Sequence, residues 1–181
     1  TTGQDGNLWF TESALNKIGK ITPTGDFTEF DLKGPGSPAG ITAGPDGNIW
    51  FTETGRNKIG KITNSGVITE FDIPTAYSNS LGITTGPDGN IWFTEYDGNK
   101  IGKITPSGVI TEFDIPTANS KSIDITKGLD GSLWLTEQFG NKIGKITTAG
   151  TITEYNLPAY STPQGITTGP DGNLWFTEFQ A

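Results

Sequence analysis

The 181-residue sequence contains no cysteine, no histidine and no methionine. The absence of cysteine excludes disulfide bonds and thiolate metal sites. The absence of histidine removes the side chain that most often carries protons near neutral pH. Positive charge is also scarce, since 12 lysine and arginine residues stand against 20 aspartate and glutamate residues and leave a net charge of −8. We therefore expect no nucleic-acid partner, because phosphate binding needs clustered positive charge.

No stretch of the sequence is apolar enough to cross a membrane, so no membrane partner is expected and the chain is predicted to be soluble. Neither a signal peptide nor an initiator methionine is present at Thr1. These features favour a processed, trimmed or partial form of a longer protein. They leave cytoplasmic and secreted locations both open.

What the sequence does contain is one block repeated five times. The block reads Asp-Gly-Asn-Leu-Trp-Phe-Thr-Glu at residues 5–12, and closely related copies start at residues 46, 88, 130 and 171. The tryptophans of successive copies are 41, 42, 42 and 41 residues apart. A constant spacing near 40 residues indicates one structural unit that is stacked repeatedly. Residues common to all copies are expected to hold the unit together, so departures from the repeat are the better candidates for function.

Each unit contains four short segments with strand character. In the third unit these are residues 82–86, 91–95, 100–105 and 109–115, which are rich in β-branched and aromatic residues. The Asp-Gly and Pro-Ser-Gly sequences between them are typical of tight turns. Four antiparallel strands in every ~40 residues predict an all-β protein, a β-propeller segment of four-stranded antiparallel blades. We name the strands of a blade A to D from the inside outward.

The repeat divides the chain, a single domain, into four blades and a half blade. They are expected at about 1–38, 39–80, 81–122 and 123–163, with the half blade at 164–181. Four full blades plus a terminal A–B hairpin are thus predicted, as part of a larger or multichain ring. The alternative is a closed four-bladed ring with a spare hairpin. Antiparallel order places the B–C turns and the D–A crossovers on one face, where a ligand-binding mouth would form.

The string Gly-Pro-Asp-Gly-Asn-Ile-Trp-Phe-Thr-Glu, followed by Asn-Lys-Ile-Gly-Lys-Ile-Thr and Ile-Thr-Glu-Phe, closely resembles the repeat of the virginiamycin B lyase (streptogramin B lyase) family. The resemblance covers essentially the whole chain. It implies seven-bladed propellers that open a cyclic depsipeptide antibiotic at its ester by elimination, with assistance from Mg²⁺. It also implies catalytic histidines, some of them just before strand A. The matching positions here are Ala39, Leu81, Ile123 and Gln164, so no catalytic residue carries over.

Three hypotheses of function follow. The favoured one is a binding or scaffold module that resembles streptogramin B lyase, is inactive as a lyase by itself and needs no cofactor. The first alternative is a fragment of an active Mg²⁺-dependent carbon–oxygen lyase whose catalytic blades are missing. The second is a structural, self-associating repeat protein. The partner would be a small molecule or a protein at the mouth, or further blades or copies that complete the ring.

The glutamate that ends every block is tempting as part of a carboxylate ring for a cation. Because it occurs in every copy, we instead expect each glutamate to serve its own blade. It would accept backbone N–H groups of the B–C turn or pair with the lysine that follows, as Glu95 with Lys100. The same reasoning makes the tryptophans core residues between blades, and the Asp-Gly-Asn segments tight turns rather than Ca²⁺ loops. The five glutamates are Glu12, Glu53, Glu95, Glu137 and Glu178.

Departures from the repeat supply the candidate ligand-binding residues. An aspartate and a lysine flank strand A of the fourth blade, where other copies have glycine and a threonine or alanine. Aromatic and polar side chains on the variable mouth segments add a second set, since exposed aromatic residues on loops are typical of binding surfaces. The complete candidate set is Tyr77, Tyr96, Asp124, Lys127, Gln138, Phe139, Tyr160 and Gln164.

Overall fold

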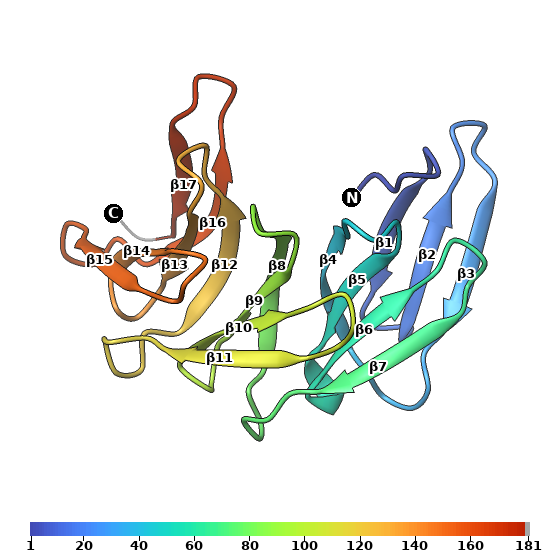
Figure 1. Ribbon diagram of the computed structural model, residues 1–181, viewed down its shortest axis with the longest axis horizontal. Coiled ribbons are helices and arrows are strands. Elements are labelled where there is room, and N and C mark those ends of the chain that lie inside the picture. Colours follow the sequence, from blue (N-terminus) through green and yellow to red (C-terminus); the bar gives the residue numbers. More distant parts are fainter. Residues whose placement is uncertain (180–181) are drawn as a thin grey trace.

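The computed structural model describes residues 1–179, which form 17 antiparallel strands (Figure 1). Their one helical segment, the 3₁₀ turn Thr54–Arg56, is far too short to cross a membrane. The first sheet contains β1 (Leu8–Glu12), β2 (Lys17–Ile21) and β3 (Phe27–Asp31). The second contains β4 (Pro38–Ala43), β5 (Ile49–Glu53), β6 (Lys58–Ile62) and β7 (Ile68–Asp72).

The remaining sheets repeat this order. The third contains β8 (Ser80–Thr85), β9 (Ile91–Glu95), β10 (Lys100–Ile104) and β11 (Ile110–Asp114). The fourth contains β12 (Ser122–Lys127), β13 (Leu133–Glu137), β14 (Lys142–Ile146) and β15 (Ile152–Asn156). The last contains β16 (Pro163–Thr168) and β17 (Leu174–Glu178).

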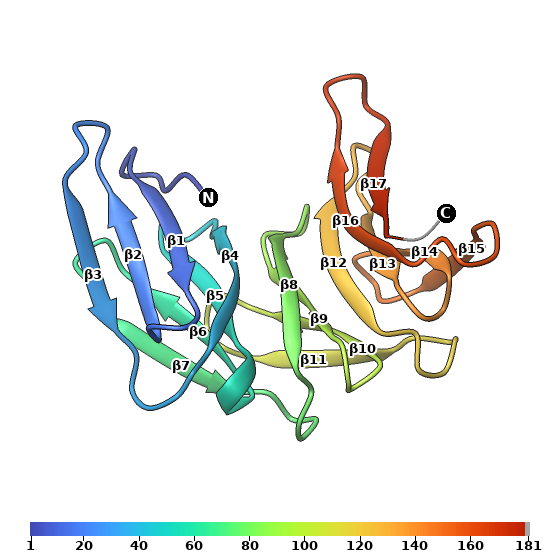
Figure 2. The same cartoon turned by 180° about the vertical axis from the view of Figure 1, so that it is seen from behind.

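The five sheets lie side by side in an arc, with β4, β8, β12 and β16 as the inner strands (Figures 1 and 2). The predicted first strand A is reduced to a single bridge between Thr2 and Leu8. Over the described residues the arc stays open, with the first sheet and the β16–β17 hairpin at its two ends. The fold is therefore a β-propeller segment, and the alternative of a closed four-bladed ring is wrong.

A hydrogen-bond relay through the repeated threonine joins each sheet to the next. The inner strands shift register against their neighbours near their first residues, as between Ser80 and Ile83. There Thr94 Oγ1 accepts a hydrogen bond from the Gly82 N–H at 3.0 Å and donates one to the Ile123 carbonyl of the next sheet at 3.1 Å. One hydroxyl thus satisfies two backbone groups at a β-bulge. The same relay occurs at Thr52 and Thr136.

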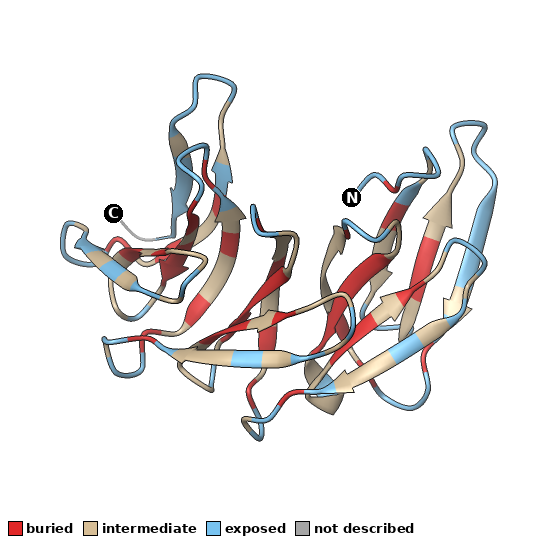
Figure 3. Cartoon of the chain, in the orientation of Figure 1, coloured by how far each residue is buried: buried red, intermediate tan, exposed pale blue. Residues whose placement is uncertain are grey.

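The hydrophobic core lies between neighbouring sheets (Figure 3). One cluster brings Trp50 of β5 together with Ile91 and Phe93 of the following sheet, and all three are fully buried. Trp50 also stacks on Phe71 with ring centroids 5.7 Å apart, and the Lys61 ammonium lies 5.0 Å from the indole centroid. Trp50 therefore joins two sheets, and Trp9 and Trp92 lie in equivalent clusters.

The Asp-Gly-Asn segments are tight turns, as predicted. In the second sheet Asp46 Oδ1 accepts hydrogen bonds from the Trp50 indole N–H at 3.0 Å and from the Asn48 backbone N–H at 3.2 Å. Gly47 takes the left-handed conformation with φ 78°, which glycine adopts without steric cost. The aspartate thus ties the turn to the core tryptophan rather than to a cation.

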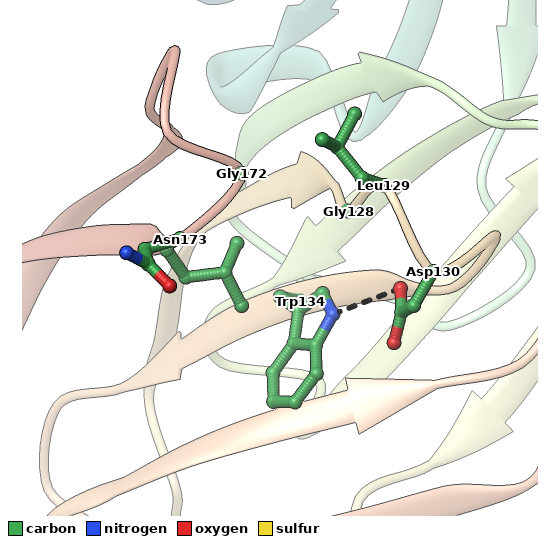
Figure 4. A pocket seen from close by; sticks show the side chains of 7 residues that line it. Gly128, Leu129, Asp130, Trp134, Gly172 and Asn173 are labelled. Atoms are coloured by element: carbon green, nitrogen blue, oxygen red, sulfur yellow. Dashed lines mark hydrogen bonds between the residues drawn. The ribbon is translucent and has the colours of Figure 1, made fainter.

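The prediction that all five tryptophans are core residues holds for three of them. Trp9, Trp50 and Trp92 are at most 1% exposed, whereas Trp175 is 60% exposed. Trp134 is half-buried and lines a hollow of about 240 Å³, where its indole N–H donates to Asp130 (Figure 4). The three buried tryptophans each lie in a cluster with residues from the second and third strands of the following sheet, the third strand contributing Ile62, Ile104 and Ile146. The last sheet has no third strand among the described residues, so this hollow follows from the packing pattern.

Candidate functional site

The turn between the second and third strands of a sheet lies against the crossover that leads into its first strand. The backbone N–H groups of Asp97 and Gly98 both donate to the Ser78 carbonyl, at 3.0 and 3.3 Å. Those of Phe139 and Gly140 similarly donate to Ser120. These turns and crossovers share one face, as the antiparallel order predicts. We call this face, residues 75–79, 96–98, 117–121, 138–140 and 158–162, the mouth face.

A polar network joins two neighbouring turns of the mouth face. Tyr96 Oη donates a hydrogen bond to Gln138 Oε1 at 3.3 Å. The Lys121 ammonium lies 4.9 Å from the centroid of the Tyr96 ring and forms an ion pair of 2.6 Å with Asp97. Asn79 also donates to Asp97, at 3.0 Å. The hydrogen bond from Lys121 holds the pKa of Asp97 below its ordinary value. Two predicted residues, Tyr96 and Gln138, are thus in direct contact.

Two further predicted residues, Phe139 and Tyr160, line one open groove of about 600 Å³ together with Gln138. It lies between the 138–140 turn and the 158–162 crossover. The Phe139 and Tyr160 side chains are 67% and 80% exposed. We call this feature the rim groove; its lining residues are Gln138, Phe139, Asn141, Ala159, Tyr160 and Thr162.

Tyr77 lies on a different crossover and is 90% exposed. Tyr77 and Tyr160 both have positive φ, 56° and 69°, in the left-handed region that bulky residues rarely occupy. Asn119 holds the corresponding place in the crossover between them, with φ 54°, and asparagine tolerates this conformation well. A tyrosine there destabilises the crossover while leaving its ring in solvent. That combination favours a role in binding.

Asp124 and Gln164 lie on the inner strands. The Asp124 carboxylate accepts hydrogen bonds from the backbone N–H groups of Ile125 and, in β16, of Ile166, each at 2.9 Å. Burial raises the pKa of Asp124, although both N–H groups act in the opposite direction. Lys127 is exposed at the end of β12, and no ion pair joins it to Asp124 among the described residues. Gln164 contributes its carbonyl to the threonine relay at 2.7 Å.

The repeated glutamates form no carboxylate ring. Glu95 is fully buried beneath its own turn, and neither carboxylate oxygen accepts a hydrogen bond from the described residues. Both expected partners of Glu95, the backbone N–H groups of the turn and the Lys100 ammonium, are therefore wrong. Lys100 forms an ion pair with Asp114 of the outer strand instead. Glu53 and Glu137 are buried in the same way, whereas Glu178 is exposed.

Each buried glutamate faces a second glutamate from the outer strand. Burial and the facing Glu112 carboxylate raise the pKa of Glu95 to about 8, against the opposing effect of Lys100. Burial and a facing carboxylate likewise raise the pKa of Glu53 and Glu137 to about 7. Below these values one carboxyl of the pair is protonated and can share its proton with the other. Burial therefore favours a neutral glutamate here.

These acid pairs do not fit the Mg²⁺ that the family resemblance implies. Mg²⁺ needs near-octahedral oxygen ligands. No three acidic side chains converge within residues 1–179. In the third sheet, Glu112 is already engaged by the Thr75 N–H and hydroxyl, at 2.8 and 2.9 Å.

Sequence reasoning missed Asn79, Asp97 and Lys121, which complete the mouth-face network. A signal was present in the repeat itself. The corresponding position of three successive crossovers carries Asn79, Lys121 and Thr162, so this place differs in every copy.

The chain matches a known protein family over its whole length. The sequence model of the virginiamycin B lyase family matches residues 1–181. Virginiamycin B lyase from Staphylococcus aureus is 51% identical with a TM-score of 0.97, over 100% of this chain and 62% of that protein. A streptogramin B lyase is 45% identical with a TM-score of 0.97, over 100% of this chain and 61% of that one. Among curated proteins, none matches the chain.

A third solved structure is a catalytically inactive histidine-to-alanine variant of virginiamycin B lyase from Staphylococcus aureus with quinupristin. It is 51% identical with a TM-score of 0.96, over 99% of this chain and 62% of that protein. The chain thus spans about 62% of the length of these relatives.

Proposed function

Because the chain belongs to the virginiamycin B lyase family, we propose that it forms a binding and scaffold sector of a streptogramin-binding propeller and does not open the antibiotic by itself. The observation that carries this proposal is the absence of histidine from all 181 residues. The Staphylococcus aureus relative in which one histidine is replaced by alanine is catalytically inactive. An elimination at an ester needs a group that removes a proton from the adjacent carbon.

The positions that match the family's histidines support the proposal. Ala39, Leu81 and Ile123 carry aliphatic side chains and Gln164 carries an amide, none of which takes up a proton near neutral pH. The carbonyls of these residues accept hydrogen bonds from the threonine relay, as Ala39 does from Thr11 at 2.9 Å. The backbone at these positions therefore serves the scaffold, and the side chains offer no proton carrier.

The ligand would contact the mouth face. The Tyr96–Gln138 pair offers a hydroxyl and an amide, and the rim groove offers aromatic surface, which together suit a peptide-like ligand with apolar rings. Since the buried acid pairs favour a proton rather than a cation, a metal that assists ring opening would need ligands other than these pairs. In that case further blades, of the same polypeptide or of another, would supply the proton-carrying histidine.

The test is to incubate the chain with a streptogramin B antibiotic and Mg²⁺ and to follow ring opening by mass spectrometry. The Staphylococcus aureus lyase serves as the active control. We expect the antibiotic to stay intact with this chain alone, and its addition to shift NMR signals of the mouth face. Turnover by the chain would overturn the proposed inactivity.

Two variants test the location of binding. Tyr77→Ala and Tyr96→Ala are expected to weaken antibiotic binding without loss of fold, because both side chains lie at the mouth face and outside the core. Asp124→Ala is expected instead to loosen β12 from β16, since it removes the hydrogen bond that the Ile166 N–H of β16 donates. If both tyrosine variants bind as the parent does, the ligand contacts a different surface.

A second candidate function is self-association or completion by further blades, and exposed apolar side chains at both ends of the arc favour it. Leu8 and Phe27 of the first sheet are 53% and 68% exposed, and Trp175 of the last sheet is 60% exposed. Ile49, the counterpart of Leu8 in the second sheet, is 1% exposed because the preceding sheet covers it. The open ends thus expose surfaces that elsewhere in this chain are interfaces.

A further inference from the structure

The rim groove has a counterpart one sheet earlier, so the repeat supplies its own comparison. In that counterpart the turn carries Tyr96 and Asp97, and the crossover carries Lys121. The lysine side chain spans from crossover to turn, with its ammonium 2.6 Å from the Asp97 carboxylate and 4.9 Å from the centroid of the Tyr96 ring. The earlier groove is therefore filled by a side chain of the protein itself.

At the rim groove both members of that ion pair are replaced by uncharged residues. Phe139 stands where Asp97 stands in the earlier turn, and Thr162 stands where Lys121 stands in the earlier crossover. A threonine side chain is too short to span the gap, and a groove of about 600 Å³ remains. No charged side chain lines it, so a charged ligand would lose hydration there without gaining a counter-charge.

The new residues make the groove aromatic. Phe139 and Tyr160 are 67% and 80% exposed and line the groove from the turn and from the crossover. Tyr160 occupies the left-handed position that Asn119 fills in the earlier crossover. At the edge, the Gln138 amide uses its Oε1 to accept from Tyr96, which orients its Nε2 side as a donor for a ligand carbonyl.

We propose that the rim groove binds a neutral aromatic ring, the phenyl or phenol side chain of a peptide-like ligand. The lining offers no counter-charge to an ion, and exposed aromatic walls stack favourably on another ring. The site belongs to the turn and the crossover of the fourth sheet, so it does not depend on whether a complete ring opens an antibiotic.

The test is an NMR titration of the chain with N-acetyl-phenylalaninamide. We expect saturable shifts at the backbone amides of Phe139 and Tyr160 and at the Gln138 side-chain amide. The dissociation constant should be on the order of 1 mM, the range for a fragment of this size. N-acetyl-leucinamide and N-acetyl-lysinamide, as aliphatic and cationic comparators, should bind at least about fivefold more weakly.

The decisive variant rebuilds the earlier groove. Phe139→Asp combined with Thr162→Lys reproduces the Asp97–Lys121 pair and should fill the groove, weakening binding at least about tenfold with little change in the unfolding midpoint. Tyr160→Asn, which copies Asn119, removes one aromatic wall. It also removes the backbone strain of a tyrosine in the left-handed conformation. It should weaken binding while leaving thermal stability equal or higher.

Three outcomes would overturn the proposal: no saturable shifts around the rim groove, equal binding of the leucine or lysine probe, or unchanged binding in a folded variant with the rebuilt pair. None of them bears on the proposed absence of lyase activity, which is measured separately by ring opening.

Discussion

At the scale of single residues, the glycine of each Lys-Ile-Gly-Lys-Ile strand is required by the side chain on the strand before it. A Cβ atom placed on Gly102 would lie 2.0 Å from Cζ of the buried Phe93 ring. In the fourth sheet Leu135 replaces this phenylalanine, and the nearest atom to a Cβ on Gly144 is Leu135 Cγ at 2.8 Å. The recurring glycine thus makes room for the aromatic ring of the neighbouring strand. The space that a Cβ atom would have at this position depends on the size of that facing side chain.

We therefore expect Gly102→Ala to lower the free energy of unfolding by about 1–3 kcal/mol, the usual cost of overpacking a dense core. Gly144→Ala should cost less, because leucine can change rotamer more easily than a buried ring. Chemical denaturation measures both. Adding Phe93→Leu to Gly102→Ala should recover part of the loss, and equal losses for the two glycine variants would contradict this explanation.

At the scale of elements, the buried acid pairs connect the second strand of a sheet to its outer strand and to the mouth face. Glu95 ends β9 and faces Glu112 of β11, which holds Thr75 of the preceding crossover. The charges around Glu95 are those of Glu112, Asp114 and Lys100, and the two carboxylates outweigh the lysine. The folded chain therefore favours a proton on this pair that the unfolded chain releases.

This pairing predicts that the protein is less stable at alkaline than at acidic pH. The folded-state pKa of Glu95, about 8, lies above its ordinary value of 4.5, so the folded state binds more protons between these values. The stabilisation is complete below about pH 4.5 and is lost as the pH rises through 8. Glu53 and Glu137 act in the same direction, through about pH 7.

Thermal unfolding between pH 5 and 9 measures the effect. We expect the melting temperature to fall by several degrees over this range, since about 1 kcal/mol corresponds to ~2–4 °C in a domain of this size. Glu95→Gln should reduce the slope, most of all near pH 8, because glutamine keeps the shape without the charge while Glu53 and Glu137 still titrate. Glu178→Gln is the matched control at an exposed position and should leave the slope unchanged. A melting temperature that is constant or rises with pH would refute the assignment.

The strands of this protein can be predicted closely from the sequence, whereas the side-chain contacts of the candidate site cannot. The predicted strand at 91–95 is observed as Ile91–Glu95, but the inner strand starts at Ser80 rather than at residue 82, because pairing with Glu95 continues across the bulge. Periodicity identifies strands but cannot tell that Lys100 turns to Asp114 and leaves Glu95 without an ion-pair partner among the described residues. That choice depends on side-chain positions in three strands.

Contacts of the mouth face are still harder to derive from sequence. Tyr96 and Gln138 are 42 residues apart and meet because equivalent turns of successive sheets lie next to one another. The rim groove depends on how far the side chain at position 162 reaches, which no spacing rule reports. Departures from the repeat indicated Phe139 and Tyr160 as candidate ligand-binding residues, but not that both line the same groove.

At the scale of the whole molecule, the same interface pattern runs from sheet to sheet and ends in two unlike faces. The first sheet exposes Leu8 and Phe27, whose counterparts Ile49 and Ile68 in the second sheet pack against the preceding sheet. The last sheet exposes Trp175, a counterpart of the tryptophans that pack against the following sheet. The face of the first sheet corresponds to one side of the inter-sheet interface, and the face of the last sheet corresponds to the other side. Contact between copies would therefore be head-to-tail rather than symmetric.

Because the two end faces differ, the predicted association is head-to-tail, and a symmetric dimer would behave differently in the following experiment. The parent chain should associate with rising concentration in sedimentation experiments, and Phe27→Lys or Trp175→Lys alone should each reduce association, because each removes one of the two unlike faces. Mixing the two variants should restore a 1:1 complex, since each contributes the face that the other has lost. A strictly monomeric parent at high concentration would count against self-association. A mixture that fails to pair while both variants stay folded would place the contact on other surfaces.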